Sequence, residues 1–193
     1  MSNKGDGTRQ QILDTARRIL RERGPEAFVL REVAERLGIR HGNVQYYFRT
    51  RQELLLAVFD RELEKYTESM NTAVAGKKTR RDRLDAIVNS GLAQLRSPDT
   101  SLWWMMVAMA GHSREMAAIL DRENSSYQKA VAKELKRIAP SLSPQRRRHV
   151  AVVIQAMIDG ISVQRMRMSR KSPDTRAVDK QIRATIHALV EGR

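Results

Sequence analysis

The residues best suited to chemistry lie between Arg40 and Tyr46. In a helical reading of this stretch, Val44 and Tyr47 or Phe48 fall on one side, and hydrogen-bonding side chains are left on the other. Arginine can pair with guanine O6 and N7, and asparagine or glutamine with adenine N6 and N7. The pattern therefore predicts a surface that reads base edges, carried by Arg40, His41, Asn43, Gln45 and Tyr46.

Catalytic and metal-binding patterns are weak by comparison. The four histidines are widely separated, and the sequence has no paired-histidine zinc motif, phosphate-binding glycine loop or serine nucleophile motif. His112 and Glu115 share a helix face and could supply half of a metal site, although a hydrogen-bonded surface pair is the simpler reading. We therefore expect no enzyme, no cofactor and no metal. Because residues distant in sequence can converge, an all-helical enzyme stays open as an alternative.

The polar run must be held by a neighbouring helix. Val33 and Leu37 are one turn apart and face inward, Ala34 is small enough for a second helix to approach, and Gly38 allows the positive φ that ends the first helix. Together with Ile39 this predicts a helix-turn-helix. An ordinary helical hairpin is the alternative, and the polar outer face and basic chain argue against it.

Charge and composition narrow the class of partner. The chain has 36 Lys and Arg against 22 Asp and Glu, a net charge of +14, which attracts polyanions such as nucleic acid. Only part of this excess falls in residues 1–52, which hold eleven basic and six acidic residues. A nonspecific basic nucleic-acid-binding protein is therefore a second reading.

The absence of cysteine indicates a reducing compartment and excludes disulfides and thiolate chemistry. No apolar run reaches the roughly 20 residues of a membrane span, and the polar opening does not resemble a signal peptide. We expect a cytoplasmic protein without a membrane association.

Helix signals recur along the whole chain. Possible capping boxes begin at Thr8, Thr50 and Thr79, and Ser-Pro pairs at Ser97, Ser143 and Ser172 predict three more helix starts. Apolar residues recur at helical period without strand-like alternation. We predict an all-α fold of about nine helices, with a DNA-binding domain over residues 1–52 and a helical body over residues 53–193.

The body contains a segment, residues 102–109, that is apolar nearly all round and is expected to be a buried helix. A plain core is the default interpretation of such aromatic and methionine stripes. The alternative is the wall of a cavity for a hydrophobic or aromatic effector. The candidate lining residues are Trp103, Met106, Met109, Tyr127 and Met157.

Two arginine-rich clusters flank the helix expected after Ser143. Arg146, Arg147 and Arg148 open it at the end where the helix dipole disfavours cations, so helix stability does not explain them. Arg165, Arg167, Arg170 and Lys171 lie at its other end, where the dipole favours them. We assign neither cluster to DNA.

The first fifty or so residues resemble the N-terminal domain of the tetracycline-repressor (TetR) family. The resemblance covers roughly Thr8 to Phe59. It is carried by Gly24–Ala27, Leu30–Ala34, Leu37–Ile39, Gly42–Val44, Tyr46–Phe48, Arg51, Glu53 and Leu54. It implies a homodimer that binds a palindromic operator through three-helix heads and a small-molecule effector through the helical body. Repression is the regulatory effect that it favours.

By position, the resemblance places Arg40 to Asn43 at the major groove, and Tyr46 and Tyr47 near phosphates. Arg51 stands where a lysine usually opens the fourth helix. Val29 and Gln45 depart from the usual threonine and tyrosine, and we hypothesise that Gln45 reads a base. The full set of DNA-binding candidates is Arg31, Arg40, His41, Gly42, Asn43, Gln45, Tyr46, Tyr47 and Arg51.

The resemblance also implies that the last two helices pair with those of a second chain, with Gly160 allowing close helix approach. Packing within one chain is the alternative. The dimerisation candidates are Val150, Val153, Ile154, Met157, Ile158, Ile161, Val178, Ile182, Ile186 and Leu189.

Overall fold

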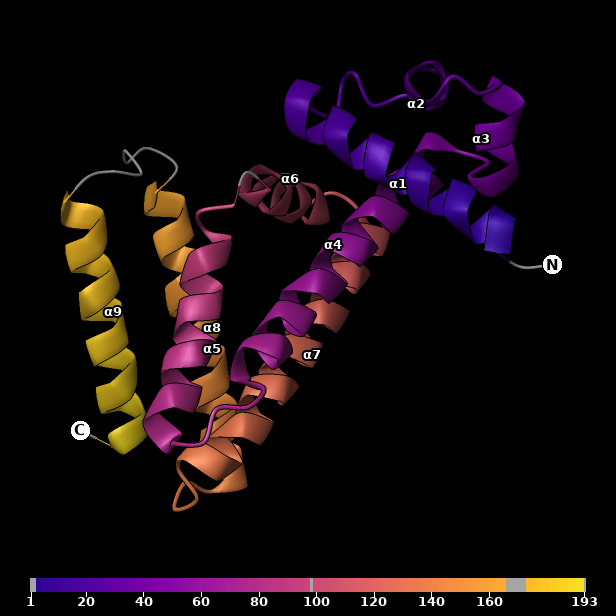
Figure 1. Ribbon diagram of the computed structural model, residues 1–193. Coiled ribbons are helices and arrows are strands. Elements are labelled where there is room, and N and C mark those ends of the chain that lie inside the picture. Colours follow the sequence, from indigo (N-terminus) through magenta and orange to yellow (C-terminus); the bar gives the residue numbers. More distant parts are fainter. Residues whose placement is uncertain (1–2, 98, 166–172, 193) are drawn as a thin grey trace. The chain divides into compact units, whose positions relative to one another are not determined.

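The computed structural model describes residues 3–97, 99–165 and 173–192, which contain nine α-helices and no strand (Figure 1). The expected all-α fold is confirmed. The helices are α1 (Asn3–Arg23), α2 (Leu30–Leu37), α3 (His41–Tyr47), α4 (Arg51–Val74), α5 (Arg80–Gln94), α6 (Thr100–Ala110), α7 (Arg114–Ile138), α8 (Pro144–Arg165) and α9 (Pro173–Glu191).

The chain divides into two compact units. Unit 1 contains the residues up to Glu64 together with Ser101–Leu120, and unit 2 contains Lys65–Thr100 and the residues from Asp121 onward. This division differs from the expected boundary after residue 52. The first half of α4 and the start of α7 pack with the N-terminal helices, so both long helices contribute to both units.

Unit 1 has its own apolar core beneath α1, α2 and α3. Ile12, Ile19, Phe28, Val44 and Phe59 have no exposed surface, and they form one cluster with apolar residues of α4, α6 and α7. Burial of large side chains of this kind is the main stabilising contribution to such a fold.

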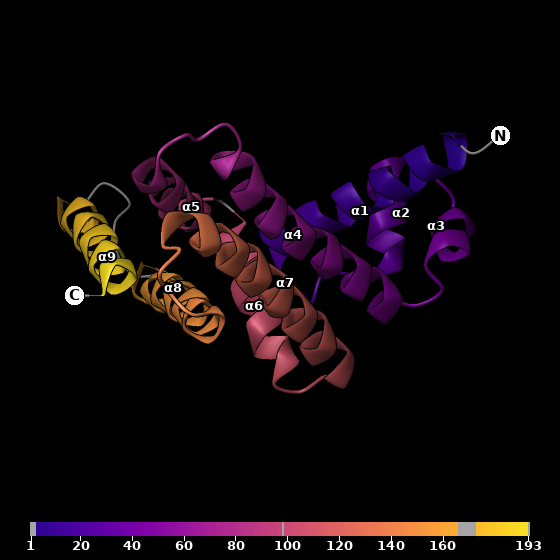
Figure 2. The same cartoon turned by 90° about the horizontal axis from the view of Figure 1, so that it is seen from below.

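Unit 2 contains a second core, in which α5, α8 and α9 contact one another (Figure 2). Gly91 of α5 explains how closely α5 and α8 approach. A Cβ atom at Gly91 would lie 2.5 Å from Ile158 Cδ1, so any larger residue would displace the buried Ile158 side chain. A close helix approach therefore occurs at Gly91 within the chain, and no atom of the described chain lies within 4 Å of a Cβ built at Gly160, whose expected role between two chains stays a prediction.

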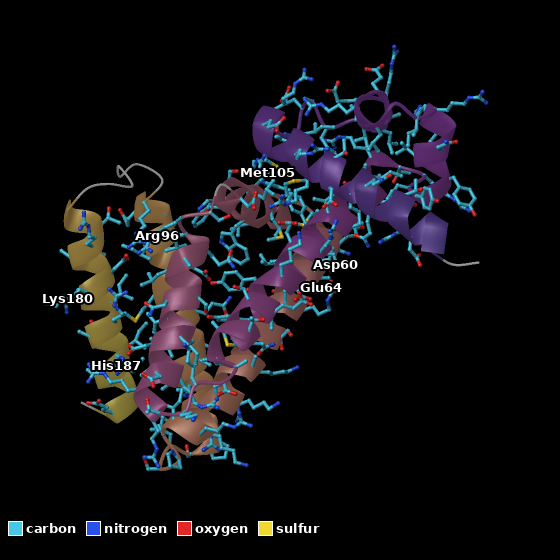
Figure 3. The ribbon with its side chains drawn as sticks, in the orientation of Figure 1. Asp60, Glu64, Arg96, Met105, Lys180 and His187 are labelled. Atoms are coloured by element: carbon cyan, nitrogen blue, oxygen red, sulfur yellow. The ribbon has the colours of Figure 1, made fainter. Side chains whose placement is uncertain are left out.

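A row of polar contacts joins α5 to α9. His187 Nε2 lies 2.7 Å from Asp85 Oδ1, and Arg183 Nη1 donates to Asn89 Oδ1 at 3.0 Å. Farther along, Arg96 Nη2 donates to the buried Asp179 Oδ2 at 2.6 Å, and Arg165 also pairs with this carboxylate. Figure 3 labels Arg96 and His187 toward the two ends of this row. These pairs orient α9 against the body.

Several expected helix starts are confirmed. Thr50 Oγ1 accepts a hydrogen bond from the Glu53 N–H, Thr79 Oγ1 from the Asp82 N–H, and Ser143 Oγ from the Arg146 N–H. The start at Thr8 is wrong, because α1 already begins at Asn3. α6 begins at Thr100, later than expected. Pro98, Ser172, Arg167, Arg170 and Lys171 lie outside the described residues.

The expectation that residues 102–109 are buried all round is also wrong. In α6 only Leu102 and Met106 are buried. These two residues lie on the face of the helix that packs against the unit 1 core, and the remaining residues of α6 keep part of their surface exposed. None of the described helices has the length and apolar character that a membrane span requires.

Candidate nucleic-acid interface

The turn between α2 and α3 is set by Gly38. It has φ 65°, in the left-handed region that glycine adopts most readily, and the Ile39 N–H donates to the Ala34 carbonyl at 3.1 Å. Val33 and Ala34 of α2 and Val44 of α3 are buried in the angle between the helices. The predicted helix-turn-helix geometry is present.

The polar face of α3 points away from this core. Arg40, His41, Gly42, Asn43, Gln45 and Tyr46 are all exposed, and Tyr46 keeps 82% of its surface. The side chains of Arg40, His41, Asn43 and Gln45 make no hydrogen bond or ion pair with any residue that the structure describes. The Tyr47 ring is half-buried and packs edge to face against Tyr46, with 5.1 Å between the centroids. The polar face is therefore free to donate and accept hydrogen bonds outside the chain.

Arg51, another DNA-binding candidate, has a structural role of its own. Its Nε donates to the Phe28 carbonyl and its Nη2 to the Pro25 carbonyl, each at 2.7 Å, and the guanidinium lies 5.8 Å from the Phe28 ring centroid. It therefore ties the start of α4 to the connection between α1 and α2. Arg31 is exposed and pairs with Glu35 one turn away, at 2.8 Å.

Sequence reasoning missed an ion-pair network that braces α2 against α1. Arg36 binds Glu22 at 2.9 Å and Glu32 at 3.0 Å, and Arg23 binds Glu32 at 2.9 Å. The Arg36 hydrogen bond lowers the pKa of Glu22. The spacing of Glu32 and Arg36 on one helix signals their pairing, but the contact to Glu22 depends on the tertiary fold.

The effector candidates fall in two cores. Trp103, Met106 and Met109 belong to the unit 1 cluster, and Tyr127 and Met157 to the unit 2 cluster. Whether any of them contacts a ligand stays a prediction. No group of three or more His, Asp or Glu able to hold a metal ion occurs in the part of the chain that was searched, the described residues.

The dimerisation candidates require a correction. Five of them are buried within the single chain and so have little or no surface for a second one: Val150, Ile154, Ile158, Ile182 and Ile186. Val153 is exposed, and Met157, Ile161, Val178 and Leu189 are half-buried. Periodicity identified the apolar stripe but could not show that half of these candidates are buried in the core of their own chain.

A three-helix head whose third helix, α3, is exposed and polar is typical of a helix-turn-helix DNA-binding protein. Comparison with known protein families supports this class of protein. Residues 12–58 match the family of bacterial regulatory proteins of the tetR type, and residues 80–191 match the C-terminal domain of BetI-type transcriptional repressors.

Individual relatives are more distant. The HTH-type transcriptional regulator BetI of Rhizobium meliloti (strain 1021) is 26% identical over 166 residues, 85% of this chain and 79% of that protein. A transcriptional regulator from Saccharomonospora viridis in complex with choline has a TM-score of 0.76 at 18% identity, covering 96% of each chain. Salmonella enterica GusR has a TM-score of 0.79 at 15% identity, covering 98% of each. The chain belongs to the TetR family of transcriptional regulators and carries a C-terminal domain of the BetI type. It is a transcriptional regulator with a helix-turn-helix DNA-binding head.

Proposed function

We propose that this regulator represses transcription by binding a palindromic operator as a homodimer, and that a small effector bound in the helical body releases it. The observation that carries the proposal is the exposed face of α3, whose Arg40, His41, Asn43 and Gln45 side chains have no partner among the described residues. Hydrogen-bonding groups of this kind match the donors and acceptors of the major groove.

The proposed dimer uses the outward face of α8. Val152, Val153 and Val163 keep 45%, 42% and 47% of their surface, and they are three of the five large apolar residues that are exposed among those described. Ala156 and Gly160 lie on the same face and are also exposed. The spacing i, i+4, i+8 and i+11 from Val152 forms a continuous ridge of small and β-branched side chains. Such a ridge would let the same helix of a second chain pack closely.

The first experiment selects bound sequences from random duplex DNA at fixed salt, and then measures the affinity of an Arg40→Ala, Asn43→Ala double variant for the selected site. We expect one palindrome to be preferred over random DNA by at least about a thousandfold, and the double variant to lose most of that preference. Arg146→Ala, which removes an exposed arginine from α8, is the control for lost charge and is expected to keep it.

Two results would contradict this function. Steeply salt-dependent binding without a preferred sequence would support the nonspecific alternative. Undiminished binding by the double variant would show that α3 does not read the operator.

A further inference from the structure

The surplus positive charge of the helical body is concentrated in two short segments of unit 2. Residues 53–193 contain 25 Lys and Arg against 16 Asp and Glu. Eleven of these basic residues and only two of the acidic ones fall in segments 75–83 and 132–149, and the rest of the body holds fourteen of each sign. The net charge of +9 in the body therefore belongs to these two segments, which we call the basic end.

The fold brings both segments to the same end of unit 2, where α5 and α8 begin and α7 ends (Figure 1). Arg83 of α5 binds the buried Glu134 of α7 at 2.6 Å, and Arg137 binds the same carboxylate at 3.2 Å. Arg147 of α8 donates to the Leu142 carbonyl at 2.7 Å, in the connection that follows α7. These three arginines hold the basic end together, so their role is structural.

The other eight basic residues have no such role. All are exposed, and their side chains make no hydrogen bond or ion pair within the described part of the chain: Lys77, Lys78, Arg80, Arg81, Lys133, Lys136, Arg146 and Arg148. The four arginines among them lie in the first turns of α5 and α8, where the helix dipole disfavours cations. Repulsion between like charges adds to this cost. A polyanion bound from outside the chain would relieve both.

We propose that the basic end is a second DNA-binding surface, which binds the phosphate backbone of double-stranded DNA without regard to sequence. It acts in addition to the exposed face of α3 and goes beyond the proposed function. Arg146 and Arg148, which the sequence alone assigns to no partner, contact phosphates in this proposal. Because phosphate contacts carry no sequence information, the basic end raises the affinity for all duplexes alike. Arg146→Ala therefore stays a suitable control for the palindrome preference.

The composition of the basic end favours duplex DNA over other polyanions. Neither segment contains Phe, Tyr or Trp, on which the bases of single-stranded nucleic acids stack. None of the five large apolar residues that are exposed among those described lies in the basic end, so it has no such side chain to insert into a lipid bilayer. Seven of its eleven cations are arginines, whose guanidinium can bind a phosphate through two parallel hydrogen bonds.

The test uses the full chain with Arg40→Ala and Asn43→Ala in place, which weakens the contribution of α3, and a short random-sequence duplex as the probe. Arg81→Gln and Arg146→Gln then remove two exposed cations from the basic end. We expect the slope of log affinity against log salt concentration to become shallower by roughly two, because each lost phosphate contact reduces counterion release. Affinity at low salt should fall by at least about tenfold.

The matched control combines Arg176→Gln and Lys180→Gln, which remove the same charge from exposed positions on α9; Lys180 is labelled in Figure 3. Lys180 adjoins Asp179, which binds Arg96 just beyond the opposite end of α5. This variant should keep the salt slope of its background nearly unchanged. An equal change of slope in both variants would show that net charge alone is responsible, and would overturn the proposal.

Three further measurements bear on the same surface. Thermal unfolding should show the Arg81→Gln, Arg146→Gln variant to be at least as stable as its background, because both cations lie near helix N-termini. A clear loss of stability would instead show that these arginines support the fold. Tighter binding to single-stranded DNA, or to phosphatidylserine-containing vesicles, than to the duplex would overturn the choice of partner. All these probes lack the operator, so a missing palindrome preference would contradict the proposed function alone.

Discussion

Asp159 shows how a single residue can reduce stability. Burial raises its pKa from 3.8 to about 6, so the folded chain binds this proton more tightly than the unfolded chain does. Folding at neutral pH therefore requires a charge to be held where it is poorly solvated. The difference of about two pKa units corresponds to roughly 3 kcal/mol, which is a large share of the stability of an ordinary domain.

The pH dependence of stability follows from this shift. Between about pH 4 and pH 6 the folded state holds a proton on Asp159 that the unfolded state has lost. The contribution of this residue to the free energy of unfolding therefore falls as the pH rises through that window, and above about pH 6 it falls no further. Tyr66 and Tyr127, whose pKa values burial raises further, stay neutral throughout.

We expect Asp159→Asn to increase the free energy of unfolding by about 1–3 kcal/mol at pH 7.5 and to change it little at pH 4. Urea unfolding at the two pH values measures both quantities, with Glu68→Gln as the exposed-acid control. An equal effect of Asp159→Asn at both pH values would mean that the carboxyl charge is not the cause.

At the scale of the element, the helices differ in how far their own sequence specifies them. Residues Thr50, Thr79, Ser143 and Gly38 mark helix ends through local chemistry, and the structure uses each as expected. The start at Thr8 was wrong because a capping box is also compatible with a helix interior when more helical residues precede it.

The face that an apolar stripe buries was harder to predict. The periodicity of α8 is compatible with two partners, its own chain and a second one. Only the fold shows that Ile154 and Ile158 are buried in the core of their own chain, with Ile158 next to Gly91 of α5. The grouping of Tyr66, Tyr127 and Asp159 was only partly visible for the same reason. Tyr127 was among the effector candidates, but Tyr66 and Asp159 are 61 and 32 residues away from it in sequence, and no local pattern joins them.

The α5 and α8 contact gives a prediction at this scale. Gly91→Ala would bring a methyl group to 2.5 Å from Ile158 Cδ1, and we expect a loss of about 1–3 kcal/mol in the free energy of unfolding despite the better helix propensity of alanine. Denaturant unfolding measures it. Gly7→Ala, which meets nothing within 4 Å, is the control and should be neutral or slightly stabilising.

The contact itself can be tested by a second substitution. Ile158→Val removes the Cδ1 atom, so the loss caused by Gly91→Ala should be smaller in the Ile158→Val background. Strictly additive effects would place the cause of the destabilisation elsewhere.

For the whole molecule, the arrangement of charge and apolar surface bears on assembly. Both cores are closed within one chain, so the chain does not need a partner in order to bury them. In the proposed dimer, the partner chain would cover the ridge on α8. Joining two chains also joins two DNA-binding heads, which is what allows two half-sites to be bound at once.

Substitution of Gly160 by arginine is expected to separate the proposed dimer without disturbing the folded chain, because the position is exposed and nothing lies within 4 Å of it. Sedimentation at micromolar concentration should give the monomer mass, and affinity for the selected palindrome should fall by more than about tenfold. Thr72→Arg, at an exposed position on α4, introduces the same side chain as a control. A dimer that persists in Gly160→Arg would exclude this face of α8 as the interface.

The outward side chains of α3 rest on a scaffold that does not depend on them. Since the exposed side chains of Arg40, His41, Asn43 and Gln45 make no hydrogen bond or ion pair with the described residues, their replacement should leave folding almost unaffected. Paralogues could therefore acquire new target genes by a few changes at these positions, and an engineer could retarget this regulator while keeping the rest of its fold intact.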